Sequence, residues 1–216
     1  MILLICFACC ASYLIGSLPF GLWIGLAWKG VDIRTLGSKN IGATNVLRVL
    51  GPGPAAVVFV LDTLKGALAI IVFIDLLLPG AAVPFLYRVL IGLCAILGHT
   101  FSPFLRFKGG KGVATSLGAL LALNPLVATV ALIAWGLVLA FSRYVSLASL
   151  VAAWTLPFAA FNIAPPSDQR WLVGLGLGLA ILVTVKHRSN IARLLSGTES
   201  KIGKRVETPA ESAEVR

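Results

Sequence analysis

The chain has 216 residues, of which 58% are hydrophobic and 12% are charged, and its formal net charge at pH 7 is +10. Because about 25% of the residues of an average protein are charged, this composition excludes an ordinary water-soluble domain. Residues 1–28, 112–142 and 144–167 contain no charged side chain, and each run exceeds the roughly 20 residues that cross a bilayer as a helix. The sequence therefore predicts an all-α integral membrane protein.

Seven hydrophobic segments predict seven transmembrane helices, at residues 2–27, 54–77, 85–104, 112–124, 126–141, 146–164 and 171–186. The first segment lacks the basic N-terminal region of a signal peptide, and it is about twice as long as the apolar core of a signal peptide. We therefore expect it to be a retained transmembrane helix. The fourth and fifth are divided at Asn124-Pro125, a turn-forming pair; one long tilted helix is the alternative. We expect one transmembrane domain over residues 1–202 and a polar, disordered tail over 203–216.

The basic residues predict how the helices are oriented. Fifteen of the 18 Lys and Arg residues fall in the loops after the first, third and fifth helices or from Lys186 onward. The positive-inside rule then places the N-terminus outside and the C-terminus in the cytoplasm. The loops at 37–48, 98–115, 142–149 and 186–201 would share the cytoplasmic face as short re-entrant or interfacial segments. Topology and anionic lipid headgroups explain the net charge, so no nucleic-acid partner is expected.

The segment from Gly98 to Thr115 has the composition of an anion-binding loop. Glycines let successive backbone N–H groups converge on an anion, and a helix beginning near Val113 would direct its positive dipole end to the same place. The alternative is a basic loop that only sets topology. The expected phosphate-binding residues of this segment are Lys108, Gly109, Gly110, Lys111, Gly112 and Thr115.

Three other polar segments would lie on the same face. The first loop offers hydrogen-bonding groups and a guanidinium for phosphate and hydroxyl oxygens, or its Asn and Ser residues only cap turns; these residues are Ser38, Asn40, Gly42, Thr44, Asn45 and Arg48. His187, Asn190 and Arg193 share one face if their segment is helical, where the alternative is a membrane-surface anchor. Ser146 lies at helical spacing with Ser142 and Ser149, which could equally mediate helix packing.

Several polar residues have mainly structural interpretations. Asp62 and Lys65 are three residues apart on one predicted helix, where a supporting ion pair is favoured over catalysis. His99 is read as a packing or capping group, with direct chemistry as the alternative. The four cysteines and the scattered acidic residues predict no disulfide framework, metal site or cofactor.

Taken together, these motifs resemble the acyl-phosphate:glycerol-3-phosphate acyltransferase family of bacterial inner membranes. The resemblance rests on five ordered stretches: Ser38-x-Asn40-x-Gly42-Ala43-Thr44-Asn45 with Arg48, Asp62-x-x-Lys65-Gly66, Gly98–Thr115, Arg143–Ser149 and His187–Glu199. One departure is Lys39, where the family commonly has glycine. The His-x-x-x-x-Asp motif of acyl-CoA-dependent acyltransferases is absent, since positions 104 and 192 are Phe and Ala.

The resemblance implies a multi-pass enzyme of the bacterial cytoplasmic membrane with its active site facing the cytoplasm. It would transfer a fatty acyl group from acyl phosphate to the 1-hydroxyl of glycerol 3-phosphate, giving lysophosphatidate and phosphate. The implied catalytic residues are His187, Asn190, Lys111 and Ser146, with His187 acting either as a base or as a phosphate-binding cation. Arg193 is expected to help bind substrate phosphate. Arg143 and Glu199 would be structural. The other implied partners are membrane lipids and an enzyme that produces acyl phosphate.

Two alternatives belong to other functional classes. A transporter of a phosphorylated anion would use the same basic loops but would also need polar groups near the bilayer midplane and on both faces. A scaffold for other lipid-synthesis enzymes would assemble normally without activity. The short, nearly uncharged outer loops favour an enzyme that opens to one side.

Overall fold

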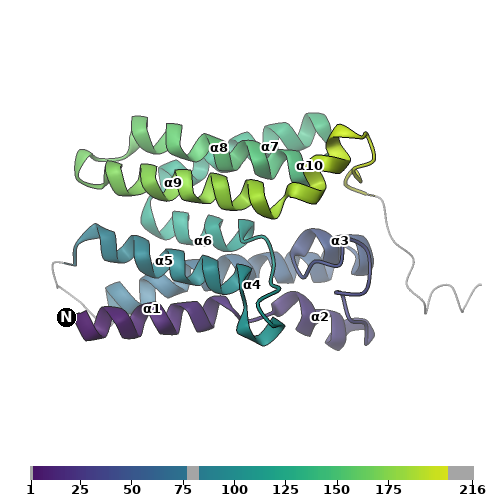
Figure 1. The fold of residues 1–216 in the computed structure, drawn as a ribbon, viewed down its shortest axis with the longest axis horizontal. Coiled ribbons are helices and arrows are strands. Elements are labelled where there is room, and N and C mark those ends of the chain that lie inside the picture. The colour runs from purple at the N-terminus through teal and green to yellow at the C-terminus, as the bar shows by residue number, and fades with distance from the viewer. Residues whose placement is uncertain (1, 77–82, 204–216) are drawn as a thin grey trace, which may run out of the picture.

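The computed structural model describes residues 2–76 and 83–203, which form a bundle of helices (Figure 1). Six stretches are long and apolar enough to cross a membrane: Ile2–Lys29, Pro52–Ile74, Phe85–Leu105, Pro125–Ser142, Val145–Ile163 and Pro166–Lys186. A seventh apolar helix, Val113–Leu123, is shorter; its 11 residues span about 16 Å. The all-helical membrane fold is thus confirmed, whereas seven crossings and their orientation remain predictions. The predicted tail from residue 204 lies outside the described residues.

The first predicted helix is two helices, α1 (Ile2–Gly16) and α2 (Phe20–Lys29). Pro19 has no N–H to donate and interrupts the helical hydrogen bonds. The carbonyls freed at the break are satisfied by distant side chains, because Ser102 Oγ donates to Ser17 O at 2.7 Å and Lys65 Nζ donates to Leu18 O at 3.1 Å. The membrane segment predicted over 2–27 is therefore present as one apolar stretch, but it consists of two helices rather than one.

The polar loop that follows contains a short helix, α3 (Ala43–Leu50), and α4 (Pro52–Ile70) continues into a π-helical turn, η1 (Ile71–Leu76). Next come α5 (Phe85–Thr100), the 3-10 turn η2 (Pro103–Leu105), α6 (Val113–Leu123) and α7 (Pro125–Ser142). The helix break predicted at Asn124-Pro125 is present, and the Asn124 side chain caps α7 by accepting from Val127 N.

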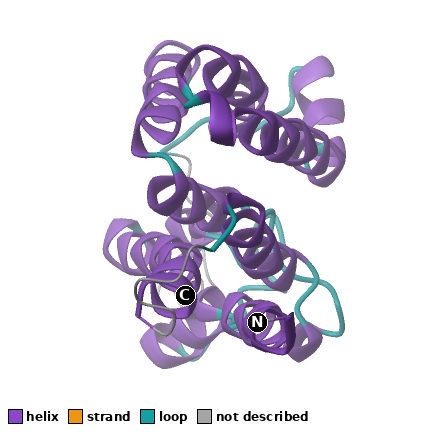
Figure 2. Ribbon diagram, turned by 90° about the vertical axis from the view of Figure 1, so that its left-hand side faces the viewer, coloured by secondary structure: helices purple, strands orange, loops and turns teal. Residues whose placement is uncertain are grey.

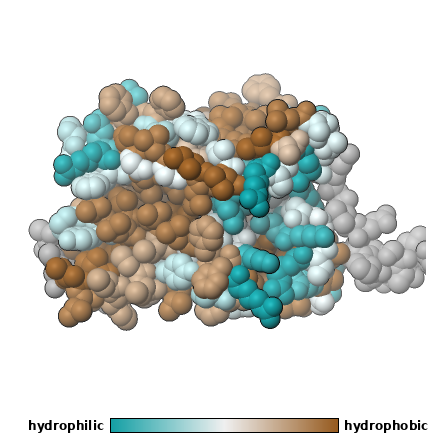
Figure 3. Space-filling model, in the orientation of Figure 1, coloured by the Kyte–Doolittle hydropathy of each residue, from teal (hydrophilic) through white to brown (hydrophobic). Residues whose placement is uncertain are grey.

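The last helices are α8 (Val145–Ile163), α9 (Pro166–Lys186) and α10 (Arg188–Leu195). Helices α7 to α10 lie on one side of α6, and α1 to α5 lie on the other (Figures 1 and 2). Glycines allow α4 and α6 to approach closely, since a Cβ at Gly66 would come within 2.1 Å of Thr115 O and one at Gly118 within 1.8 Å of Thr63 O. Hydrophobic residues cover much of the visible side of the bundle, and hydrophilic residues gather toward the end that carries α10 (Figure 3).

Candidate active site

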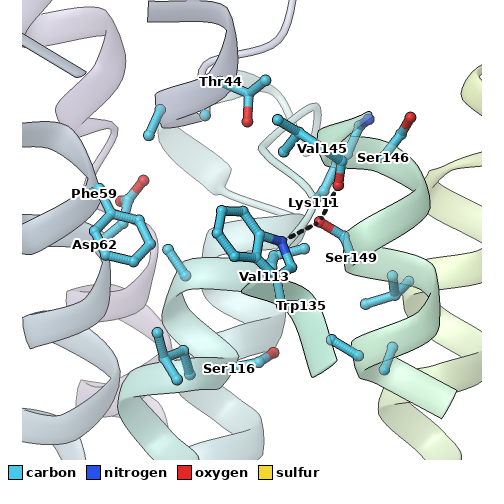
Figure 4. Close-up of a pocket in the computed structure, with 18 of the residues that line it drawn as sticks. Thr44, Phe59, Asp62, Lys111, Val113, Ser116, Trp135, Val145, Ser146 and Ser149 are labelled. Carbon is cyan, nitrogen blue, oxygen red and sulfur yellow. Dashed lines mark hydrogen bonds between the residues drawn. The ribbon is translucent and has the colours of Figure 1, made fainter. Parts of the chain in front are cut away.

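A cavity of about 420 Å³ lies between α3, α4 and α6 on one side and α7, α8, α9 and α10 on the other. Its lining is divided chemically. At the end that carries α3 and α10, which we call the polar end, the lining residues are Ser38, Asn40, Thr44, Arg48, Lys111, Ser146, His187, Asn190 and Glu199. Farther along the helices the lining is mainly apolar, and Trp135 lies among the residues between the two parts (Figure 4). The four loops predicted to meet at one face therefore do meet.

Glu199 joins the C-terminal part of the polar end. Its Oε1 accepts from Ser146 Oγ at 2.8 Å and from Asn190 Nδ2 at 2.7 Å, and its Oε2 accepts from Arg193 Nε at 2.7 Å. Burial raises the pKa of this carboxyl, but the hydrogen bonds from Asn190, Ser146 and Arg193 outweigh burial, so the net pKa is lowered. Glu199 is thus an anionic hub that fixes a hydroxyl and an amide at the cavity wall.

Lys111 extends this network from α6. Its Nζ donates to Asn190 Oδ1, so the Asn190 amide bridges the lysine and the Glu199 carboxylate. Burial lowers the pKa of Lys111 to about 8; the carboxylate of Glu199 opposes that shift, and the nearby guanidiniums of Arg193 and Arg48 add to it. Burial also lowers the pKa of Arg48. An anionic ligand would relieve both the desolvation and the mutual repulsion of these cations.

His187 lies at the junction of α9 and α10, with 3% of its surface exposed. Its Nδ1 is 2.9 Å from Val183 O. A carbonyl oxygen can only accept, so Nδ1 carries a proton, and in the neutral ring Nε2 keeps a lone pair. Burial and then the charge of Lys111 lower the pKa of His187 to about 4. Without substrate the imidazole is therefore neutral near pH 7.

The first loop contributes fewer ligand-facing groups than expected. Asn45 is buried, and its amide holds the loop together: Oδ1 accepts from Ser38 N, and Nδ2 donates to Ile33 O and Leu36 O. Asn45 also lines the cavity, so the structure adds a loop-holding role to its predicted one in binding substrate. Asn40 Oδ1 likewise accepts from Gly42 N at 2.9 Å. Lys39 adopts a left-handed conformation with φ of +59°, which is where glycine is accommodated most easily.

The expected glycine nest is also corrected. Gly109 N donates to Thr100 O at 3.3 Å and Gly110 N donates to His99 O at 3.0 Å, so these amides do not converge on the cavity. These two positions are glycine because the loop lies against the end of α5: a Cβ at Gly109 would meet His99 O at 2.1 Å, and one at Gly110 would meet His99 Nε2 at 2.0 Å. Gly112, at the start of α6, does line the cavity.

Four other residues singled out in the sequence lie outside the cavity lining, among them Arg143, which was expected to be structural. Lys108 is exposed and lies outside the cavity lining. Thr115 is fully buried, and its backbone packs on α4 rather than on the cavity. Arg193 also lies outside the lining and instead holds Glu199. Arg143 anchors the segment after α10, because its carbonyl accepts from Ile202 N at 2.8 Å.

A buried ionic cluster lies beside the cavity. Lys65 Nζ is 2.6 Å from Asp62 Oδ1 and 2.8 Å from His99 Nδ1, and all three side chains are less than 5% exposed. Asp62 and His99 reach the cavity wall. The ion pair expected between Asp62 and Lys65 is therefore formed, and because Lys65 also donates to Leu18 O, the cluster supports the break between α1 and α2. Within residues 2–76 and 83–203, no group of three or more His, Cys, Asp or Glu residues could hold a metal ion.

Comparison with known proteins agrees with the resemblance seen in the motifs. The family model described as glycerol-3-phosphate acyltransferase matches residues 6–197. A glycerol-3-phosphate acyltransferase of Fusobacterium nucleatum is 48% identical over 192 residues, which cover 88% of this chain and 94% of the relative. The chain belongs to the glycerol-3-phosphate acyltransferase family. A second family member, from Desulforudis audaxviator, is 47% identical over 190 residues, covering 88% of this chain and 91% of the relative.

Solved structures of the family share the fold. A crystal structure of PlsY, an integral membrane glycerol 3-phosphate acyltransferase, in its glycerol 3-phosphate form superposes with a TM-score of 0.81 at 38% identity, covering 92% of this chain and 96% of that chain. The lysophosphatidic acid form gives a TM-score of 0.78 at 37% identity, covering 93% and 96%. The chain is therefore an integral membrane acyltransferase, as its motifs predicted.

The sequence motifs predicted no role for Trp135, which lines the cavity. Trp135 on α7 donates from Nε1 to Ser149 Oγ at 3.3 Å. It lies within a long apolar segment, where a tryptophan facing lipid and one facing a cavity have the same local pattern. Glu199 was expected to be structural, and the number of side chains that it holds could not be foreseen because they come from α8 and α10.

Proposed function

We propose that this chain transfers a fatty acyl group from acyl phosphate to the 1-hydroxyl of glycerol 3-phosphate, releasing lysophosphatidate and inorganic phosphate. The supporting observation is the division of one cavity into a cationic, hydrogen-bonding end and an apolar interior. Glycerol 3-phosphate needs only the first part, whereas an acyl phosphate needs both. Relatives bound to glycerol 3-phosphate and to lysophosphatidic acid match the proposed acceptor and product.

The polar end offers two cationic side chains and one helix terminus for the two phosphates. Lys111 and Arg48 both line the cavity, and α6 begins at Val113 directly after Gly112, so its first N–H groups and its positive dipole end are available to an anion. Arg48 can bind a phosphate through two parallel hydrogen bonds. The hydroxyls of Ser38 and Thr44 would contact the remaining phosphate and glycerol oxygens.

The transfer step joins the glycerol hydroxyl oxygen to the acyl carbonyl carbon and breaks the bond from that carbon to the phosphate oxygen. The hydroxyl proton passes either to His187 Nε2 or to the departing phosphate. The neutral His187 of the free site favours a hydrogen bond from the hydroxyl to Nε2. Because an acyl phosphate already has a good leaving group, the chain's main contribution is to position the reactants and stabilise charge.

We further propose seven membrane helices in the bacterial cytoplasmic membrane, of which the short α6 reaches only part of the way across, with the N-terminus outside and the polar end in the cytoplasm. The basic residues of the four loops support this orientation. An enzyme that produces acyl phosphate at the same membrane would then supply the donor. A reporter fused after residue 203 should be active only in the cytoplasm; activity on the outer side would reverse the orientation.

The decisive experiment supplies the purified protein, in detergent or lipid, with glycerol 3-phosphate and either acyl phosphate or acyl-CoA. We expect phosphate release and lysophosphatidate, detected by mass, with acyl phosphate alone. Lys111→Ala should abolish most of this activity, whereas the matched Lys108→Ala should retain it because Lys108 lies outside the cavity. Activity with acyl-CoA but not with acyl phosphate would refute acyl phosphate as the donor. A folded protein that is inactive with both donors would refute the acyl transfer reaction, and flux assays in liposomes would then test the transporter alternative.

A further inference from the structure

The cavity continues past the polar end into the interior of the bundle. Three leucines from three different helices line it away from the polar end: Leu120 on α6, Leu156 on α8 and Leu179 on α9. Their side chains are 4%, 5% and 1% exposed, and they belong to the main hydrophobic core. These buried side chains form the wall of the cavity at this end, which we call its closed end.

The depth of the cavity can be measured along each helix. Leu120 lies nine residues after Lys111, Leu156 ten after Ser146, and Leu179 eight before His187. At 1.5 Å per residue the three helices give a depth of about 12–15 Å. In a membrane of about 30 Å, the closed end would lie about halfway across the hydrocarbon core.

One face of α7 lines the cavity with one large residue, Trp135, followed toward the closed end by two small ones. The Trp135 indole is held by its hydrogen bond to Ser149 Oγ, whose hydroxyl donates to Val145 O at 2.8 Å. Figure 4 shows Trp135 between α4 and Ser149. Four and seven residues before Trp135, on the same helix face, are Ala131 and Ala128, and both line the cavity. The small side chains leave room beyond the indole that larger residues would fill.

We infer that this closed end measures the acyl chain, with the three leucines setting the longest chain that fits and Ala131 leaving space for its last methylenes. The inference rests on the proposed function, because it assigns the acyl group to the apolar part of the cavity. Burying each additional methylene contributes about fourfold to binding. A chain that is two methylenes too long for the cavity leaves both unburied and forgoes a gain of roughly 15-fold in binding.

A competing path for the chain is also visible. Phe59 on α4 and Leu132 on α7 line the cavity and are 42% and 43% exposed. A chain that left the cavity past either of these exposed residues would extend into the bilayer, and its length would then have little effect on the rate. The two paths make opposite predictions for chain-length selectivity.

The test gives the purified enzyme a mixture of acyl phosphates of graded chain length with glycerol 3-phosphate and quantifies each lysophosphatidate by mass. We expect Ala131→Leu to lower the ratio of long-chain to short-chain products by about tenfold or more while short-chain turnover persists. Leu156→Ala should raise the same ratio. Ala140→Leu, an identical change at an exposed position of α7 outside the lining, should leave the ratio unchanged.

Each outcome decides a different point. Wild-type ratios in both Ala131→Leu and Leu156→Ala, with both enzymes active, would overturn the measuring role and favour the sideways path. If Ala131→Leu fails to fold, Leu156→Ala decides alone, and an unchanged ratio again overturns the inference. Failure of the wild-type enzyme to use any chain length would instead refute the proposed function.

Discussion

Lys111 should control the alkaline limb of the enzyme's pH dependence. Burial lowers its pKa from the usual 10.5 to about 8, so about nine-tenths of the free enzyme is protonated at pH 7 and about one-tenth at pH 9. Only the ammonium form attracts a phosphate. If Lys111 binds a substrate anion, kcat/KM should therefore fall about tenfold between pH 7 and pH 9, since kcat/KM reports the ionisation of the free enzyme.

The same measurement on two variants identifies the group. Lys111→Arg keeps a charge that stays protonated across this range, so any activity it retains should be independent of pH between 7 and 9. The residual activity of Lys111→Ala should be equally flat. Phosphate monoesters have a second pKa of about 6, so the substrate contributes no titration in this window. An alkaline fall that persists in both variants would refute the assignment.

The shift also has a consequence for stability, with the opposite sign. Between about pH 8 and pH 10.5 the unfolded chain still holds the lysine proton that the folded chain has lost. The contribution of Lys111 to the free energy of unfolding therefore rises with pH across this window. Thermal unfolding of the wild type and of Lys111→Ala at pH 7.5 and pH 10 would measure the difference.

Four further predictions test separate features. Glu199→Gln replaces a carboxylate by an amide and so weakens charge-assisted hydrogen bonds such as the one from Arg193, each worth about 1.5–3 kcal/mol. We expect kcat/KM to fall roughly 10- to 100-fold and Tm to fall as well. Unchanged values of both would contradict the role of Glu199 as a hub. The ring protons of His187 should titrate near pH 4 by NMR, and a midpoint near the ordinary value of about 6.5 would show that burial does not hold it neutral. Lys39→Gly should raise stability by up to about 1 kcal/mol, because a left-handed non-glycine residue costs roughly 1–2 kcal/mol; a loss of stability would mean that the side chain makes a compensating contact. Gly118→Ala should lower Tm because its Cβ meets backbone on α4, whereas Gly136→Ala, at a helix position with open space, should not; equal effects would contradict close packing as the reason.

The membrane helices could be predicted from sequence because apolar length is a direct consequence of bilayer thickness. The break at Pro19 could not, since the apolar run continues through it. Its cost is offset by Ser102 and Lys65, which are 85 and 47 residues away from the carbonyls they bind. Partners that far away in the sequence cannot be predicted from the local pattern around Pro19.

The site was predictable as a set of residues, and less so in its roles. Converging loops and the identities of Lys111 and His187 followed from polar residues that a membrane protein would otherwise avoid. The sequence could not predict where the backbone N–H groups of Gly109 and Gly110 point. These glycines have the composition of an anion nest, but both N–H groups donate to carbonyls at the end of α5. Trp135 was missed because hydropathy does not distinguish lipid from a cavity.

The position of Glu199 in the chain makes the cavity wall depend on a residue that follows all the membrane-spanning stretches. Its carboxylate follows the last membrane-spanning stretch, yet it holds Ser146 and Asn190 at the cavity wall. The ribosome must therefore deliver every helix, and the membrane must accept each one, before the wall can close. A chain truncated before residue 199 would keep every membrane-spanning stretch and still lack the carboxylate that holds Ser146 and Asn190.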